Sequence, residues 1–441
     1  MDGKKNRRLI ELFKSLLIVA LTLSAALLMG RAQLARIPAV SSWVGSVLGV
    51  FADREAPQDG QSGGSDLNTG LRPVCLAVRN ESGRYGIQYD SDAVNASFEK
   101  ELGTLLGEAL AQAGEAYTVS EEAWRLALCA PEASVYYDFL GSVPLSALSG
   151  WLGGETNVRL TADARRLLLV SGGGGAVLYY CGAHGEYYAC SVAGELSARL
   201  REVAGDYTPN NAVFAFEWEE RYPKLAPYVM ILPDPPAPPV YTSSNPIGTG
   251  EEADLSVLLR GLSFQPQTSE VYTGAEGLVV REGMDTLRIG TDGTVFFHAS
   301  DRQNPRYPVR SAGETATKGE LVETARVLLD RGVYPGDAGF YLMGTEPGQD
   351  GTLCVYFGYL LSGCAVEVAG DGYAARVVLT EGYISEFTLH CRTYQKTGEI
   401  SAVLPEVQAV AAMNALTTDK SELLLRYLDG GGSVPACWVA G

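Results

Sequence analysis

The chain has 441 residues, of which 46% are apolar, and a formal charge of −18 at neutral pH. Residues 1–37 contain seven Lys/Arg and two Asp/Glu, a net charge of +5, so the remainder carries −18 less +5, or −23. A surface this acidic repels nucleic acid and argues against a DNA- or RNA-binding role, and the length predicts two or three domains.

The N-terminus combines a basic flank at residues 1–8 with an apolar segment at residues 9–30. Leu9–Met29 would form a helix of about 32 Å, which matches a hydrocarbon core of about 30 Å. Arg31 and Arg36 interrupt the small-residue pattern of a signal-peptidase site, so we favour a retained transmembrane anchor over a removed signal peptide. The basic flank places the N-terminus in the cytoplasm and the bulk of the chain outside the cell membrane as a single-pass protein.

The predicted anchor carries small residues four positions apart, Ala20 with Ser24 and Ala26 with Gly30. Such residues let two helices approach closely in lipid, so these four positions are candidates for membrane-helix contact. The alternative is that small residues are simply common in any membrane span.

A polar juxtamembrane segment and flexible tether at residues 31–70 precedes the first predicted domain, residues 71–230. Its residue pattern predicts α+β structure. The expected elements are a strand at 72–80, a helix at 92–113, a strand, turn and short helix at 134–154, strands at 165–191 with a turn at Gly172–Gly175, a helix at 191–204 and a strand at 211–220.

A Pro-rich segment at residues 231–252 predicts a stiff linker to a second domain, residues 253–441. The second domain's elements are expected as a helix at 253–262, a hairpin around Asp292–Gly293, a helix at 318–332, strands at 351–394, a helix from Pro405 and a closing hairpin at 421–441. The fold class predicted for both domains is α+β, with antiparallel sheets that carry helices on one face.

Eight cysteines are present. Outside the membrane, Cys181 with Cys190 and Cys354 with Cys364 are candidate disulfides that would each close a strand pair. The alternative is that they are small buried apolar residues. No CxxC pair occurs and the chain has three histidines, so we predict no metal site.

The search for catalytic residues yields only weak matches. Ser97 and Lys100 fit a Ser-x-x-Lys pattern, and residues 243–245 and 396–398 follow in the order of penicillin-binding enzymes, but the contexts are poor. The glycines at 172–175 lack the lysine and helix of a phosphate loop. His390 and Cys391 are neighbours on a predicted strand and point to opposite faces. We therefore predict no catalytic residue and no cofactor.

Tyrosine pairs recur on predicted strands, at 136–137, 179–180 and 187–188. Adjacent strand residues point to opposite faces, so one ring of each pair would face outward. These rings suggest an alternative function, an extracytoplasmic module that binds peptide or glycan. The other explanation is ordinary exposed sheet aromatics.

Several segments together resemble the YycH/YycI family of extracytoplasmic regulators of Gram-positive bacteria. The segments are GRYGIQYD, VYYDFLGSVPLSALSGWLG, NAVFAFEWEE, DTLRIGTDGTVFFHA, GYISEFTLHCRTY and SELLLRYLDGGGSVPACWVAG. The resemblance implies single-span proteins that associate with a homologous YycH/YycI-type partner and with the cell-wall sensor histidine kinase, and it supplies no catalytic residues. Our leading interpretation is therefore a membrane-anchored, non-enzymatic regulator of a two-component system. A peptide- or glycan-binding module and a cell-wall enzyme are the alternatives.

Overall fold

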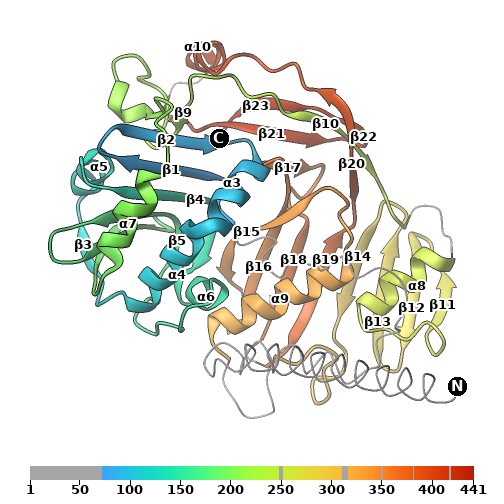
Figure 1. Ribbon diagram of the computed structural model, residues 1–441. Helices are drawn as coiled ribbons and strands as arrows, with labels where there is room; N and C mark the ends of the chain where they lie inside the picture. The colour runs from blue at the N-terminus through green and yellow to red at the C-terminus, as the bar shows by residue number, and fades with distance from the viewer. Residues whose placement is uncertain (1–71, 248–251, 310–315, 349–350, 381, 417–418) are drawn as a thin grey trace, which may run out of the picture.

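The computed structural model describes residues 72–247, 252–309, 316–348, 351–380, 382–416 and 419–441. Within these ranges the chain forms two large sheets, of seven and eleven strands, which lie beside one another (Figure 1), and two smaller sheets. All but one of the strand pairs within the sheets are antiparallel, the exception being β17 with β21. The predicted α+β class is therefore confirmed for the described residues.

The seven-stranded sheet is built from the first part of the described chain, in the order β2-β1-β4-β5-β6-β7-β3. Its strands are β1 (Cys75–Asn80), β2 (Gly83–Gln88), β3 (Tyr117–Val119), β4 (Ser134–Pro144), β5 (Asp163–Ser171), β6 (Ala176–Gly182) and β7 (Tyr187–Val192). The helices of this region are α3 (Ser91–Ser97), α4 (Gly103–Gln112), α5 (Glu121–Cys129), α6 (Leu145–Trp151) and α7 (Leu196–Gly205).

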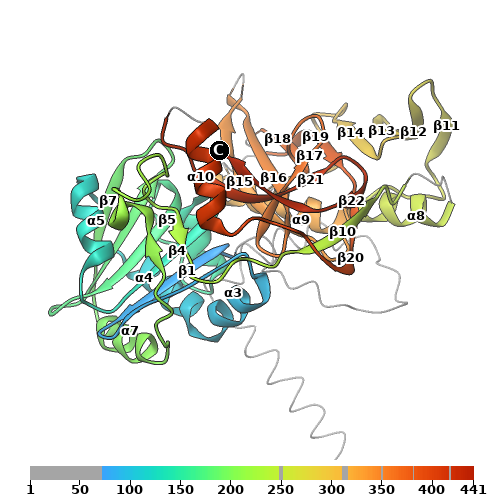
Figure 2. The same cartoon turned by 90° about the horizontal axis from the view of Figure 1, so that it is seen from above.

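Helices cover both faces of this sheet. On one face, α3, α4 and α7 pack their apolar residues against inward residues of β4 and β5, such as Tyr137 and Leu167. Helix α5 lies on the other face (Figure 2). Its Trp124 and Leu128 pack against Tyr136 and neighbouring residues. The prediction that helices occupy a single face is wrong for this sheet. Strand β4 has apolar residues pointing to both faces, so both faces must be shielded from water.

The predicted helix at 92–113 forms, but in two parts. Asp90 caps its start by accepting a hydrogen bond from the Ala93 amide at 3.0 Å. A π-helical turn, η1 (Phe98–Leu102), then separates α3 from α4. Phe98 and Leu102 within this turn are both buried, so the apolar face continues through the irregular segment.

The eleven-stranded sheet is built from the second half of the chain. Its strands run in the order β11-β12-β13-β14-β19-β18-β16-β17-β21-β23, and β15 also pairs with β16. Their bounds are β11 (Glu270–Thr273), β12 (Gly277–Glu282), β13 (Asp285–Gly290), β14 (Thr294–His298), β15 (Gly339–Pro347), β16 (Leu353–Leu361), β17 (Cys364–Val368), β18 (Ala375–Leu379), β19 (Ile384–His390), β21 (Leu423–Asp429) and β23 (Ala436–Ala440). Two helices, α8 (Glu252–Gly261) and α9 (Lys318–Gly332), lie across one face (Figure 1).

Helix α9 is buried more deeply than its charged sequence suggests. Arg326 contacts Glu323 at 2.7 Å and Asp330 at 2.6 Å, so its guanidinium is held between two carboxylates of the same helix. Burial raises the pKa of Asp330 to about 6, although Arg326 opposes that shift. Thr317 and Glu320 form a capping box that fixes the start of the helix.

Part of the segment expected to be a linker forms a strand. It contains β10 (Pro239–Ser244), the central strand of a three-stranded sheet between β20 (Thr393–Ile400) and β22 (Gly432–Val434). Just before it, β9 (Met230–Ile231) pairs with β8 (Val213–Phe214), which is followed by a short 3-10 helix, η2 (Ala215–Trp218). Proline favours an extended backbone in a strand as much as in a spacer, so composition alone does not separate the two.

The two large sheets share one apolar core. Strand β4 lies against β15, and a Cβ placed on Gly141 would lie 2.0 Å from the Leu342 carbonyl oxygen. Further along, Gly319 of α9 comes so close to Ala147 of α6 that an added Cβ would lie 3.1 Å from the alanine Cβ. A side chain at Gly141 would therefore clash with the β15 backbone, whereas one at Gly319 would only be tightly packed.

The expected transmembrane segment, residues 9–30, and the tether at 31–70 lie outside the described residues. In the part of the chain that is described, no helix combines the length and apolar character needed to cross a membrane.

Candidate functional site

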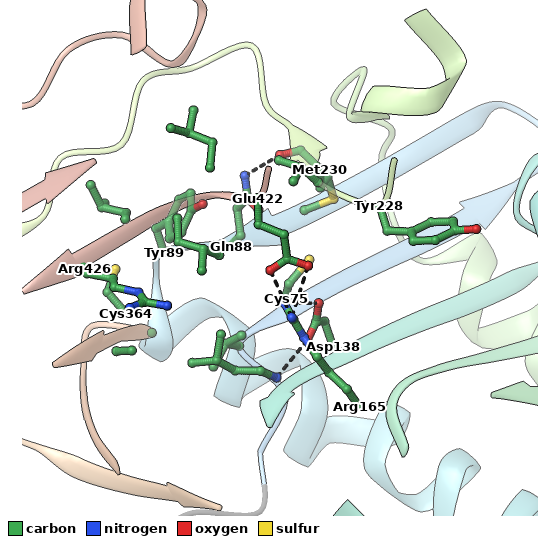
Figure 3. A pocket seen from close by; sticks show the side chains of 18 of the residues that line it. Cys75, Gln88, Tyr89, Asp138, Arg165, Tyr228, Met230, Cys364, Glu422 and Arg426 are labelled. Atoms are coloured by element: carbon green, nitrogen blue, oxygen red, sulfur yellow. Dashed lines mark hydrogen bonds and ion pairs between the residues drawn. The ribbon is translucent and has the colours of Figure 1, made fainter. Parts of the chain in front are cut away.

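A small cavity of about 50 Å³ lies between the two large sheets (Figure 3). The first sheet contributes β1, β4 and β5 to its wall, and the second contributes β17 and β21. Most of the wall is apolar, but Asp138, Arg165, Arg166 and Glu422 form a charged cluster on it, which we call the inter-sheet ion network. Four ion pairs join these residues at the junction of the two sheets.

The network depends on a local irregularity in β5. Arg165 and Arg166 are adjacent, and in a regular strand they would point to opposite faces. Instead, the pairing of β5 with β6 skips from Ala164 to Arg166, and the pairing with β4 skips from Asp138 to Val143. The resulting bulge turns both guanidinium groups toward the same carboxylate.

Asp138 lies at the centre of the network. Its carboxylate accepts hydrogen bonds from Arg165 Nε at 2.8 Å, from Arg165 Nη2 at 3.2 Å and from Arg166 Nε at 3.1 Å. It also accepts one from the backbone amide of Leu140 at 2.8 Å, in a turn where Leu140 has a φ of 67°. An apolar residue in this left-handed conformation is strained, which indicates that the surrounding contacts hold the turn.

Glu422 brings the second sheet into the network. It precedes β21, and its carboxylate accepts from Arg165 Nη1 at 3.0 and 3.1 Å and also from Arg166 Nη2. The Arg166 guanidinium lies 5.5 Å from the centroid of the Tyr228 ring, in cation–π range. Two arginines of one sheet thus join a carboxylate of their own sheet to a carboxylate of the other.

The electrostatics of the network fix its protonation state. Burial alone would raise the pKa of Asp138, but the charges of Arg165 and Arg166 outweigh it and lower that pKa to about 2. A carboxylate that stays ionised and fully hydrogen-bonded at neutral pH is a poor proton donor or acceptor for a reaction. The chemistry of the network suits mechanical attachment of the sheets better than acid–base catalysis.

The described residues contain no group of three His, Cys, Asp or Glu side chains placed to hold a metal ion. At the network, the two carboxylates are already occupied by guanidinium groups. Arginine in this position competes with a cation for the same oxygens.

The four candidates for membrane-helix contact, Ala20, Ser24, Ala26 and Gly30, lie outside the described residues and stay predictions.

The two expected disulfides are not formed in the structure, where all eight cysteines are free thiols. On paired strands β6 and β7, Cys181 is opposite Tyr187 and Cys190 is opposite Leu178, three positions along the ladder. That offset, about 10 Å, exceeds the span of a disulfide. Cys354 and Cys364 lie toward opposite ends of the β16–β17 hairpin, since Cys364 pairs with Leu361. The alternative, that the cysteines act as small apolar residues, fits five of them, which are buried.

The tyrosine pairs considered from the sequence are partly or fully buried. Tyr136 and Tyr137 are both buried, on opposite faces of the sheet. Trp124 of α5 packs against Tyr179 and Tyr187, with ring centroids 6.5 and 5.7 Å apart. Tyr179 and Tyr187 are thus half-buried against a second apolar cluster under α5, which covers part of each ring.

The Ser-x-x-Lys match has a structural explanation. Ser97 ends α3, and Lys100 contacts Asp206 at 3.2 Å on the exposed surface. Residues 243–245 and 396–398 belong to the β10 and β20 region of the small sheet. Because Lys100 already has a carboxylate partner, its geometry gives no activation of the Ser97 hydroxyl.

His390 belongs to a hydroxyl–imidazole–carboxylate line that the sequence did not reveal. Its Nδ1 lies 3.2 Å from the Thr294 hydroxyl and its Nε2 lies 3.1 Å from Asp371. The Thr294 hydroxyl, however, donates its proton to Asp292 at 2.9 Å. The hydroxyl proton is therefore directed at Asp292 and not at His390 Nδ1, so the hydroxyl-to-imidazole hydrogen bond that nucleophile activation needs is not made.

Sequence reasoning missed the inter-sheet ion network. A signal for it existed in the adjacent arginines before the apolar run Leu167–Val170, because two neighbouring charges at the start of a buried strand need partners. The partner Glu422 lies 257 residues after Arg165 and 256 after Arg166. Such a distant partner cannot be read from one sequence.

Comparison with known proteins gives one informative result. No family model matches the chain, and no curated protein matches its sequence. Among solved structures, the chain is similar to the crystal structure of YycH from Bacillus subtilis, with a TM-score of 0.53 and 12% sequence identity. The match covers 85% of this chain and 94% of that chain. The described part of this chain therefore has a YycH-like fold.

Proposed function

We propose that this chain is a membrane-anchored extracytoplasmic regulator of a two-component sensor histidine kinase. The observation that carries the proposal is the YycH-like fold, which extends over 85% of the chain. It is supported by the N-terminal sequence, where a basic flank precedes an apolar stretch long enough to span a bilayer. The proposed partners are the kinase and a homologous YycH/YycI-type protein.

The proposed mechanism uses the rigidity of the junction between the sheets. The inter-sheet ion network and the shared apolar core hold the two halves as one unit, so a force on either half acts on the whole ectodomain. The ectodomain would set the position of the anchor helix, and that helix would bias the kinase between two packing states. A bound partner shifts this balance only if it binds the two states with different affinity.

A direct test is co-purification from native membranes. The full chain, carrying an affinity tag, is extracted in mild detergent, and the recovered proteins are probed for the sensor kinase. Recovery of the kinase with the full chain, and its loss when residues 9–30 are exchanged for an unrelated membrane span, is the expected result. Equal recovery with the exchanged span would remove the anchor helix from the proposal.

A finer test concerns the small residues of the anchor. Replacing Ala20 and Ser24 together by leucine should change transcription from a kinase-dependent promoter, because bulky side chains keep two helices apart. The matched control is Ala25→Leu, which adds the same side chain on another side of the helix. An unchanged output for the double variant contradicts contact through this surface. N-terminal sequencing of the mature chain tests the anchor itself, since a start after Arg31 would mean that the segment is removed.

A further inference from the structure

A second cavity, of about 440 Å³, lies where three distant parts of the chain meet. Its wall is formed by the turn between β2 and α3, by the proline-rich segment before β10, and by the start of α10 (Glu406–Leu416). Ser362 and Lys396 complete the wall. The cavity is therefore built from residues that only the folded chain brings together.

Glu406 is the unusual residue of this cavity. Its side chain is 5% exposed, and one of its oxygens, Oε2, accepts a hydrogen bond from the Leu232 amide at 3.2 Å. The other oxygen, Oε1, is buried and has no hydrogen-bond partner. A buried carboxylate needs hydrogen-bond donors at both oxygens, and a neutral carboxylic acid needs an acceptor for its proton, so neither form is satisfied. A buried polar group of this kind calls for an explanation.

The charges around the cavity indicate the sign of a ligand. Asp90, Asp92 and Asp234 line it together with Glu406, and Lys396 is the single basic residue among the lining residues. The lining thus carries three more acidic than basic side chains and favours a cation. Since the described residues contain no cluster placed to hold a metal ion, an organic cation fits this lining better.

The remaining wall indicates the shape of the ligand. Pro235, Pro236 and Pro239 present rigid apolar surface, and Tyr89 and Leu232 add to it. The wall also contains the polar residues Gln88, Ser91 and Ser362, so the apolar surface forms one side of a mixed cavity. An apolar side beside a buried carboxylate suits an aliphatic chain with a charged end. The volume lies within the range of small-molecule sites, about 300–1,000 Å³.

We propose that this cavity binds a primary ammonium group carried on an aliphatic stem, with the Glu406 carboxylate as the buried counter-ion. The lysine side chain of a peptide and a free diamine share this chemistry. In either case the ammonium supplies the donor that Oε1 lacks, and the aspartates at the rim attract the charge as it enters. The inference does not depend on the regulatory role proposed above.

Proton binding supports this arrangement. Burial raises the pKa of Glu406 to about 7, while its hydrogen bond from the Leu232 amide acts in the other direction. Because the counter-ion must be ionised, amine affinity should rise by about tenfold between pH 6 and pH 8. The other groups of the wall are Tyr89, the three aspartates and Lys396. Cys75 also senses the Glu406 charge, since that charge raises the pKa of its thiol, although burial is the larger cause.

The test is isothermal titration calorimetry on the full chain in detergent, with two amines and one neutral analogue. Cadaverine represents a free diamine, Nα-acetyl-lysine amide represents a peptide side chain, and Nα-acetyl-norleucine amide lacks the charge. Saturable binding of at least one amine, with none of the neutral compound, is the expected result, and the stronger amine identifies the source. If neither amine binds saturably up to millimolar concentration, the proposal is overturned.

Two substitutions and a control assign the binding to this cavity. Glu406→Gln keeps the shape and removes the charge, so affinity should fall about tenfold or more and its rise with pH should disappear. Lys396→Met removes the like charge and should strengthen binding about threefold. Glu122→Gln removes an exposed carboxylate from α5 and should change nothing. Binding that is unaltered in Glu406→Gln, or weakened equally by Glu122→Gln, contradicts the assigned site.

Discussion

Two buried carboxyl groups of this protein have opposite surroundings. Asp138 is 6% exposed and Glu406 is 5% exposed, so the two are buried to the same degree. Asp138 has two guanidinium partners, and its pKa falls to about 2. Glu406 has one backbone donor and one oxygen without a partner, and burial raises its pKa to about 7. Partners, rather than burial, therefore decide the charge of each group.

The difference distinguishes two roles for buried charge. A carboxylate with every oxygen occupied holds segments together, and Asp138 does this between β4 and the bulge of β5. A carboxyl group left incomplete costs stability in the absence of a ligand, and such groups are concentrated at functional sites. The inter-sheet ion network therefore has a structural role, whereas the Glu406 cavity has the features of a ligand-binding site.

The largest expected effect is the loss of Asp138. Asp138→Ala leaves Arg165 and Arg166 buried with one carboxylate in place of two, and breaking a buried ionic group in this way costs about 3–5 kcal/mol. Urea denaturation of the full chain measures this loss. The control is Asp206→Ala, which removes an exposed partner of Lys100 and should cost less than about 1 kcal/mol. Equal effects of the two substitutions would mean that the network contributes no more than a surface pair.

A somewhat smaller effect concerns pH and Glu406. Its pKa is higher in the folded chain than its ordinary value of 4.5, so the stability that it contributes is complete below pH 4.5 and is lost as pH rises through about 7. This shift corresponds to roughly 3 kcal/mol. Asp138 acts in the opposite direction, because its lowered pKa gives stability that is complete above 3.8 and lost as pH falls toward 2.

Glu406→Gln isolates the Glu406 contribution. Asp330, whose pKa is raised to about 6, also lowers stability as pH rises, so the informative quantity is the difference between the original chain and the variant. Denaturation at pH 5 and at pH 8 should show the variant gaining stability relative to the original chain at the higher pH. A constant difference across this range would mean that Glu406 keeps an ordinary pKa in the folded chain.

A third prediction separates close packing from ion pairing at the same junction. Gly141→Ala places a Cβ 2.0 Å from the Leu342 carbonyl oxygen, so β4 and β15 must move apart. Overpacking of this kind costs about 1–3 kcal/mol. In Gly173→Ala the new Cβ meets nothing within 4 Å, and stability should be nearly unchanged. Thermal unfolding of the two variants makes the comparison, and equal melting temperatures would contradict the close approach of the strands.

Sequence reasoning predicted local elements well where periodicity was strong. The helices at 318–332 and from Pro405, the glycine turn at 172–175 and the closing hairpin all form. These elements depend on contacts within a short stretch of chain, so residue pattern and turn residues are enough to indicate them.

The same reasoning failed where distant segments decide the outcome. Residues 239–244 of the proline-rich segment form β10 because β20 and β22 pair with them as neighbouring strands. Those two strands lie about 150 and 190 residues later in the chain. The adjacent arginines share one carboxylate because a bulge changes the strand's alternation. Both the inter-sheet ion network and the Glu406 cavity combine residues from three or more separate segments. Neither site could be predicted, since no local pattern encodes which segments meet.

The smallest expected effect concerns the cysteines. The structure contains eight free thiols and places Cys181 three ladder positions from Cys190, so reducing agent has no bond to break between them. Dithiothreitol should therefore leave the melting temperature of the full chain unchanged within about 1 °C, whereas removal of a native disulfide typically costs about 2–5 kcal/mol. Intact-mass measurement after alkylation under denaturing conditions should count eight modified cysteines with or without prior reduction. A count lower by two modified cysteines per bridge, restored to eight by prior reduction, would show a disulfide and contradict the free thiols of the structure.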